Sequence, residues 1–320
     1  MFGKMMNKYY YGKSGKVDYR KEDLPKNRWQ LFWEMLRIRF SGLVRLNLLY
    51  MLIWIPTLYI VISTAFSALS MIAVTAAEPM TPELAVDLWN SLYGLVFTSL
   101  VILIPCIAIT GPFTAGVSYV TRNWARDEHA FIWSDFKDAL KENWKQGLVI
   151  STITGILPFL VFVGWRFYGS MVEGQGLFFV IPQVLIAVIG GVWSLGLLFF
   201  YPLMVTYKLR MKDLLKNGIL LAIGRFPQAL GIRLITLFPL LLGGLLIFYV
   251  VPQYYWVILA LAAYYILIGY TLSRFISASF TNSVFDRFIN LHIEGVEVNR
   301  GLSEYDEDEY DDEDDEGDEE

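Results

Sequence analysis

The sequence lacks most of what a disulfide, a metal site or a hydrolytic centre requires. Its 320 residues include one cysteine, Cys106, and two histidines, His129 and His292. A single cysteine forms no intrachain disulfide, and isolated histidines without nearby ligands do not make a zinc site. The sequence also has no P-loop, dinucleotide-binding glycine motif or serine nucleophile motif. We therefore expect no cofactor, no bound metal and no enzymatic activity.

Charged residues are scarce, at 18% of the chain, whereas hydrophobic residues make up 55% and the mean hydropathy is +0.46. Such a composition is not typical of a soluble domain and indicates a multi-pass membrane protein. The net charge of −5 combines two unlike parts. Residues 304–320 contain 14 acidic and no basic side chains, which leaves 17 acids against 26 bases, or about +9, in the rest. We expect the acidic tail to be disordered because it has no hydrophobic pattern.

Five stretches lack Asp, Glu, Lys, Arg and His over a length sufficient to cross the ~30 Å hydrocarbon core of a membrane. They are residues 46–77, 88–121, 146–165, 174–207 and 234–273. The last would be about 60 Å long as one helix. Because it contains Pro252 and Gln253 between aromatic residues, we expect a hairpin there. The sequence therefore predicts an all-α membrane bundle of about six transmembrane helices with additional interfacial amphipathic helices.

Lys and Arg are unevenly distributed between the segments that connect these stretches. All but Arg166 lie before the first stretch, after the last, or in the second and fourth connections. Short cytoplasmic segments collect Lys and Arg, so we predict a multi-pass cell-membrane protein with both termini in the cytoplasm. The predicted organisation is a basic N-terminal segment with an interfacial helix at 1–45, a six-span domain at 46–273 with cytoplasmic loops 122–145 and 208–233, a C-terminal segment at 274–303 and the acidic tail at 304–320.

The interiors of the five apolar stretches contain no ionisable residue. Charged groups within a membrane are costly and mark ion or proton pathways, so their absence argues against an ion-coupled transporter. We interpret Arg166, at the end of the third stretch, as extending to the outer interface. A pore for a neutral solute stays open as an alternative, and it would have a cavity lined by Asn47, Gln183 or Tyr201 and continuous toward both faces.

The predicted cytoplasmic face combines basic and aromatic residues. Ser134 is placed to cap an amphipathic helix, and residues 29–40 mix Trp, Phe, Leu and Arg as in a helix on the inner leaflet. We expect contacts with the lipid bilayer and its anionic headgroups, and with another membrane protein as a candidate partner, but none with nucleic acid. The candidate partner or lipid contacts are Arg122, Arg126, Lys137, Lys141, Lys145, Lys212 and Lys216.

Several different short motifs lie at separated positions between residues 43 and 290. They are LNLL with a later Pro-Thr at 46–57, ITGP at 109–112, RNWARDE at 122–128, Asp-Phe to NWKQ at 135–146, Pro202 followed by 212–217, and VFDR at 284–287. This pattern resembles the YesL-like family of bacterial integral membrane proteins, a family of unknown function. The residues that carry the resemblance include Leu46, Asn47, Pro56, Gly111, Pro112, Asp127, Phe136, Asn143, Pro202, Asn217, Phe285 and Asp286.

The resemblance implies a bacterial plasma-membrane protein, often encoded near carbohydrate-uptake genes, with no established reaction. The chain departs from the family pattern in two ways: about fifty extra residues separate the first two motifs, and a long acidic tail follows the last. The leading prediction is a non-enzymatic accessory, assembly or regulatory component of a membrane transport system, with carbohydrate uptake as one candidate. The alternative is a permease or channel for a small neutral solute.

Overall fold

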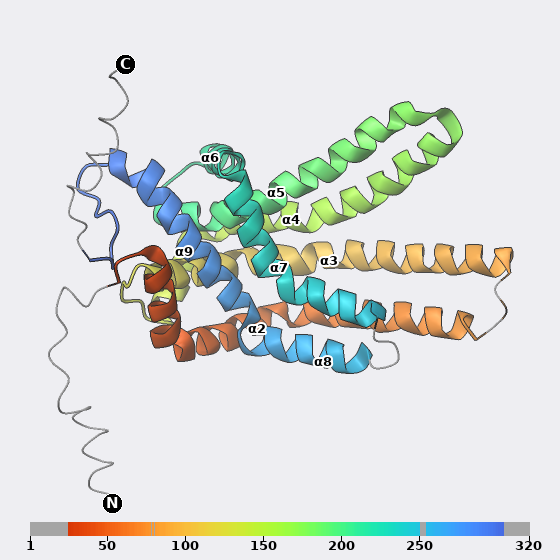
Figure 1. Ribbon diagram of the computed structural model, residues 1–320, viewed down its shortest axis with the longest axis horizontal. Helices are drawn as coiled ribbons and strands as arrows, with labels where there is room; N and C mark the ends of the chain where they lie inside the picture. Colours follow the sequence, from red (N-terminus) through yellow and green to blue (C-terminus); the bar gives the residue numbers. More distant parts are fainter. Residues whose placement is uncertain (1–24, 78, 80, 250–253, 304–320) are drawn as a thin grey trace, which may run out of the picture.

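A computed structural model describes residues 25–77, 79, 81–249 and 254–303, and every regular element within these residues is helical (Figure 1). The acidic tail and most of the basic N-terminal segment lie outside the described residues. The α-helices are α2 (Arg28–Thr75), α3 (Pro82–Ala125), α4 (Ser134–Gln175), α5 (Val180–Thr206), α6 (Met211–Gly224), α7 (Phe226–Tyr249), α8 (Tyr254–Tyr264) and α9 (Tyr270–Phe288). A π-helical turn, Tyr265–Gly269, joins α8 to α9, and short 3-10 turns cover Leu177–Phe179 and Asn290–His292.

Six helical segments of the described chain are long and apolar enough to cross a membrane, which confirms the predicted class and the predicted number of spans. The stretch 234–273 is indeed divided, because α7 ends at Tyr249 and α8 begins at Tyr254. The predicted turn residues Pro252 and Gln253 lie outside the described residues. The last span runs through the π-helical turn as one unit, Tyr255–His292.

Two predicted interfacial helices are continuous with the spans that follow them. Residues 29–40 form the first turns of α2, and Figure 1 shows these turns running steeply across one end of the bundle before the helix enters its long axis. The amphipathic segment after residue 133 likewise forms the beginning of α4. Ser134 does not cap it, because its hydroxyl contacts the Asp135 carboxylate, and the other oxygen of that carboxylate accepts the Phe131 N–H.

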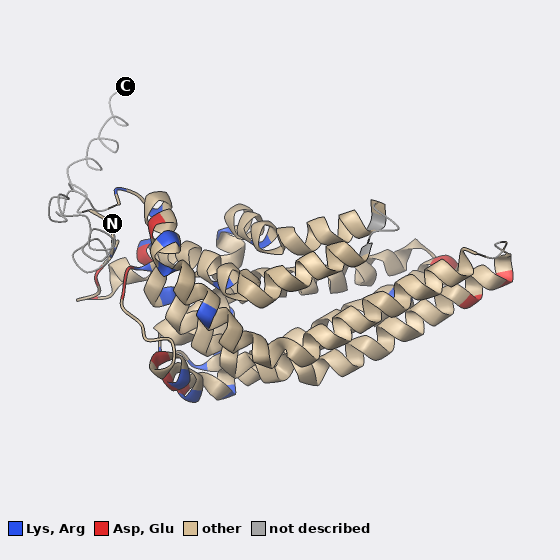
Figure 2. Ribbon diagram, turned by 90° about the horizontal axis from the view of Figure 1, so that it is seen from below, with Lys and Arg blue, Asp and Glu red and all other residues tan. Residues whose placement is uncertain are grey.

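Figure 2 shows Lys and Arg gathered at and near one end of the bundle, whereas Asp and Glu appear toward the far tips of the α2–α3 and α4–α5 hairpins. We call the first region the charged end. It comprises the start of α2, the connection between α3 and α4, α6 and the segment after α9.

Helices α3 and α4 cross in direct contact through two glycines. A Cβ added to Gly111 would lie 2.1 Å from the carbonyl oxygen of Gly147, so no larger residue fits without moving a helix. One turn further along, the ring of Phe136 occupies the space in front of Gly116. The family-like residues Gly111 and Phe136 thus hold α3 against α4.

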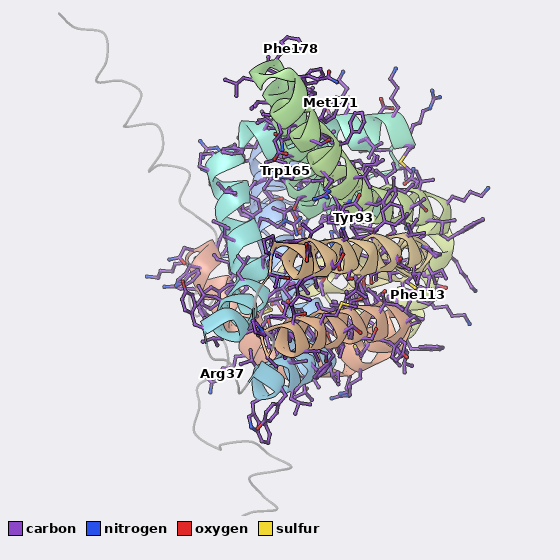
Figure 3. The ribbon with its side chains drawn as sticks, turned by 90° about the vertical axis from the view of Figure 1, so that its right-hand side faces the viewer. Arg37, Tyr93, Phe113, Trp165, Met171 and Phe178 are labelled. Carbon is purple, nitrogen blue, oxygen red and sulfur yellow. The ribbon has the colours of Figure 1, made fainter. Side chains whose placement is uncertain are left out.

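The α4–α5 hairpin diverges from the α2–α3 pair as it leaves the charged end (Figure 1). A view along the bundle shows α2 and α3 side by side, with Trp165, Met171 and Phe178 following the hairpin away from them (Figure 3). A cavity of about 910 Å³ lies between α3, α4 and α5 and is lined mainly by apolar side chains, Tyr93 and Trp165 among them.

Candidate functional site at the charged end

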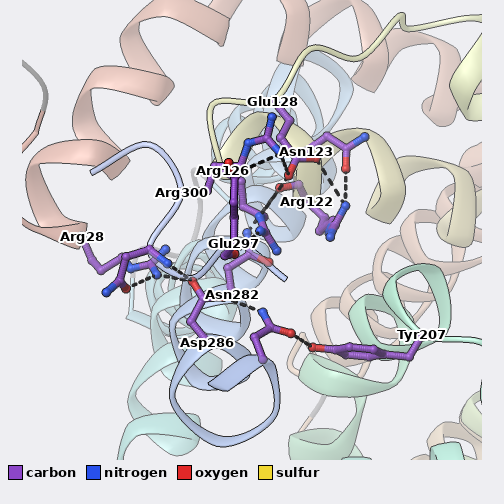
Figure 4. Close-up of polar contacts among 12 residues, drawn as sticks. Arg28, Arg122, Asn123, Arg126, Glu128, Tyr207, Asn282, Asp286, Glu297 and Arg300 are labelled. Atoms are coloured by element: carbon purple, nitrogen blue, oxygen red, sulfur yellow. Dashed lines mark hydrogen bonds and ion pairs between the residues drawn. The ribbon is translucent and has the colours of Figure 1, made fainter. Parts of the chain in front are cut away.

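Asp286 on α9 is the centre of one buried polar cluster at the charged end (Figure 4). Its carboxylate accepts hydrogen bonds from the Arg28 guanidinium, from the Asn290 side chain at 2.5 Å and from the Asn299 backbone N–H at 3.2 Å. Arg28 also donates to the Asn299 side chain at 2.8 Å. The start of α2, the end of α9 and the C-terminal segment are therefore joined at one carboxylate.

Glu128, in the connection between α3 and α4, is the centre of a second cluster. Its carboxylate forms ion pairs with Arg122 at 3.5 Å, Arg126 at 3.2 Å and Arg300 at 3.6 Å (Figure 4). Arg126 also donates to the Glu297 carbonyl oxygen at 3.1 Å. Arg300 also pairs with the Glu297 carboxylate at 3.1 Å, so the three guanidinium groups still outnumber the carboxylates that they contact.

Tyr207 and Asn282 add two further contacts to the clusters. The Tyr207 hydroxyl, just after α5, donates to the Asn290 side chain at 2.6 Å, while Asn282 of α9 donates to the Arg122 carbonyl oxygen at 3.3 Å. Burial raises the pKa of Tyr207 to about 12, against the opposing charge of Arg122. The phenol therefore keeps its proton at neutral pH and remains a donor.

The two clusters connect segments that are far apart in the sequence, and their geometry indicates a structural role. Most of their hydrogen-bonding groups contact one another, and Asp286 and Asn290 are each only 2% exposed. Across the described part of the chain, no group of three or more His, Cys, Asp or Glu side chains is arranged to hold a metal ion. The clusters fix the shape of the charged end and leave its outer surface free for contacts.

The seven predicted contact residues divide into two groups. Lys137, Lys141 and Lys145 are exposed at four-residue intervals along α4, and Lys212 and Lys216 are exposed on α6. The two arginines are placed differently from the prediction. Arg126 is 5% exposed and Arg122 is half-buried, and both pair with Glu128, so they stabilise the charged end from within.

Most of the family-like residues are packing residues. Asn47 is fully buried and donates to the carbonyl oxygens of Tyr265 and Ile266, both at 2.8 Å, while it accepts the Thr271 N–H at 3.0 Å. It thereby satisfies backbone groups beside the π-helical turn. Other members of the set are buried in helix contacts, and these are Leu46, Gly111, Phe136, Pro202, Phe285 and Asp286. The remaining members are half-buried or exposed, and these are Pro56, Pro112, Asp127, Asn143 and Asn217.

The three residues proposed to line a solute pathway lie in separate environments. Asn47 is occupied by the π-helical turn, and Tyr201 is buried with its hydroxyl 2.7 Å from that of Ser151. Gln183 donates to the Trp165 carbonyl oxygen near the far tip of the α4–α5 hairpin. The structure does not bring these three side chains together.

Several residues of the clusters were not singled out from the sequence. Glu128 lay within a motif that the resemblance marked, so the sequence contained a signal for it. Arg28 carried no such signal, because its partner Asp286 is 258 positions away. Asn290 and Arg300 belong to a polar segment whose path could not be inferred from hydropathy.

These observations define the class as a multi-pass helical membrane protein with one polar, interlocked end. A family model described as "Protein of unknown function, DUF624" matches residues 43–165, which run from α2 through most of α4. The matched region includes the contact between Gly111 and Gly147 and, from the second cluster, Glu128 with its partners Arg122 and Arg126. Comparisons with curated proteins and with solved structures found no match.

Proposed function

We propose that the chain is a YesL-like membrane protein that serves as a non-enzymatic accessory, assembly or regulatory component of a membrane transport system, with carbohydrate uptake as one candidate. In this proposal the charged end faces the cytoplasm and contacts another membrane protein. Support for the family comes from the matched region, which contains the motifs at 46–57, 109–112, 122–128 and 135–146.

The observation that carries the proposal is the contrast between the interior and the surface of the charged end. Arg28, Arg122 and Arg126 pair with carboxylates of the buried clusters, whereas the lysines on α4 and α6 are exposed. None of the ion pairs within the described chain involves Lys137, Lys141, Lys145, Lys212 or Lys216. A rigid surface with unpaired lysines suits an acidic partner surface, because charge complementarity guides association and fixes register.

The proposed orientation follows from the distribution of basic residues, which favours the cytoplasm for the charged end. A reporter fused after Glu320 is expected to be active on the cytoplasmic side. A reporter signal from outside the cell would contradict this orientation and would place the lysine surface away from cytoplasmic partners.

The proposal is tested by crosslinking in native membranes followed by affinity purification of the full chain. We expect a membrane protein to copurify with the natural chain and to be lost when Lys137, Lys141, Lys212 and Lys216 are changed to Glu. A matched control is Arg166→Glu, which reverses an exposed charge at the opposite end of the bundle. Equal recovery with the lysine variant and the control would contradict a contact at the charged end.

The alternative, a permease or channel for a neutral solute, predicts a different result. Purified protein in liposomes would then conduct a sugar or amide without any partner. The separate placements of Asn47, Tyr201 and Gln183 give this alternative less support than the lysine surface gives the leading proposal. Solute flux together with no copurifying protein would favour the alternative.

A further inference from the structure

Two arginines, Arg233 and Arg274, lie inside the helix bundle. In the sequence they directly precede and directly follow the apolar stretch 234–273. Arg233 is the eighth residue of α7 and Arg274 is the fifth residue of α9, so each belongs to a membrane-length helical segment. Both line a cavity of about 610 Å³ between α2, α7, α8 and α9. Because each arginine lies directly beside that apolar stretch in the sequence, neither was counted in the predicted span interiors.

The two guanidinium groups have little to neutralise them. Arg233 donates to the Ser194 carbonyl oxygen on α5, but its Nε is buried without a hydrogen-bond partner. Arg274 lies over the ring of Tyr201, 5.0 Å from its centroid. The ion pairs formed among the described residues involve neither arginine, and the two positive charges repel each other. Buried charge is costly unless it is paired, so this cavity is suited to an anion.

The cavity changes from polar to apolar along its length. The part nearest the charged end has both arginines together with Thr236, Ser273 and Ser277. Along the same helices, the residues farther from the charged end are apolar, and these are Val61, Ile62, Leu240, Ile247, Ile258 and Leu261. From Arg233 to Ile247 the distance along α7 is about 21 Å, which exceeds the ~15 Å of one hydrocarbon leaflet.

The helix packing explains why the cavity exists. Helix α2 packs on α3 and α9, whereas α7 packs on α8, α5 and α9, so the cavity lies between these two groups. A Cβ added to Gly244, which lines the cavity, would meet no atom within 4 Å, so there is open space at this position of α7.

We propose that this cavity binds one anionic phospholipid, with the headgroup phosphate at Arg233 and Arg274 and an acyl chain along the apolar part. The planar guanidinium group is suited to phosphate because it offers parallel N–H donors. A small free anion would satisfy only the charged part and leave the apolar part unfilled. The site is distinct from the lysine surface and does not depend on the proposed function.

Binding is tested by native mass spectrometry of the full chain in detergent, titrated with phosphatidylglycerol or phosphatidylcholine. We expect phosphatidylglycerol to bind more tightly, and Arg233→Gln or Arg274→Gln to weaken it by about tenfold. Lys212→Gln with Lys216→Gln is the control for nonspecific attraction to surface charge. Equal weakening by this control would overturn the proposal.

A second pair of variants tests the apolar part and protects the test against misfolding of the arginine variants. Gly244→Phe should fill the cavity and reduce phosphatidylglycerol binding, whereas Gly231→Phe should not, since Gly231 also has open space but does not line the cavity. Unchanged binding in Gly244→Phe would overturn the acyl-chain assignment. Competition by inorganic phosphate as effective as that by phosphatidylglycerol would overturn it as well and assign a free-anion site.

Discussion

The guanidinium of Arg28, at the first turn of α2, donates a hydrogen bond to the carboxylate of Asp286, near the last turn of α9. The first and last long helices of the bundle are thereby joined at the charged end. Because the Asp286 side chain is 3% exposed, the pair is much less screened than a surface ion pair.

Asp286→Asn should lower the free energy of unfolding by about 2–3 kcal/mol, because it leaves Arg28 and the Asn299 N–H with a weaker acceptor. The measurement is unfolding of the detergent-solubilised protein by titration with a denaturing detergent. Glu297→Gln is the control, since its side chain is 71% exposed and its pair with Arg300 should contribute less than about 0.5 kcal/mol. Equal losses in the two variants would contradict a special role for Asp286.

Gly111→Ala should destabilise the bundle by about 1–3 kcal/mol, because the added methyl group would collide with the Gly147 backbone. Gly94→Ala on the same helix should be neutral or stabilising by up to about 1 kcal/mol, since its Cβ meets no atom within 4 Å. Thermal unfolding of both variants in detergent gives the comparison. A Gly111→Ala variant as stable as Gly94→Ala would contradict the direct contact of α3 with α4.

Asn47→Ala should destabilise the protein by about 2–3 kcal/mol, because three backbone groups around the π-helical turn lose their partner. Asn143→Ala removes a single bond to the carbonyl oxygen of Ala139 within its own helix and should cost less. Hydrogen exchange at residues 265–271 should rise only in the Asn47 variant. Unchanged exchange there would contradict the role assigned to Asn47.

A chain that lacks residues 304–320, held in neutral nanodiscs, should bind anionic vesicles more tightly at low salt than the full chain does. The physical reason is the opposite charge of the tail and of the basic residues in the rest of the chain, which we expect the tail to mask. The last described residue before the tail, Ser303, donates its backbone N–H to the Pro25 carbonyl oxygen at 3.0 Å and so lies at the charged end. The difference should disappear at about 1 M salt, where charges are screened within about 3 Å. A chain with the 14 acids replaced by Asn and Gln should behave like the truncation, and equal binding by all three chains would indicate that the tail only aids solubility.

The helical class and the six spans were predictable because hydropathy over about 20 residues reflects a strong physical constraint. Gly111 and Phe136 were marked by the resemblance, but the partner Gly147 was not, since one sequence does not show which helices touch. Ser134 looked like a helix cap from its residue type, whereas the neighbouring Asp135 provides the contact instead.

Burial of charged residues was the main feature that the sequence concealed. Each predicted span ended where the first charged residue appears, so Arg233 and Arg274 fell just outside the predicted spans. In the structure both lie within helices that line a cavity. Arg122 and Arg126 were predicted as partner or lipid contacts, whereas in the structure both pair with Glu128, and Arg126 is buried. The partner of a buried charged residue is determined by tertiary contacts, which a single sequence does not show.

Site-specific photo-crosslinking in intact cells most directly tests whether the charged end contacts another membrane protein. The probe replaces Lys141 or Lys216, and a control probe replaces Trp89, which is 69% exposed near the far tip of α3. We predict an adduct with an integral membrane protein from both lysine positions and none from position 89, with loss of the adduct when the other exposed lysines are changed to Glu. Adducts from position 89 alone, or none from positions 141 and 216, would contradict the proposed role of the charged end.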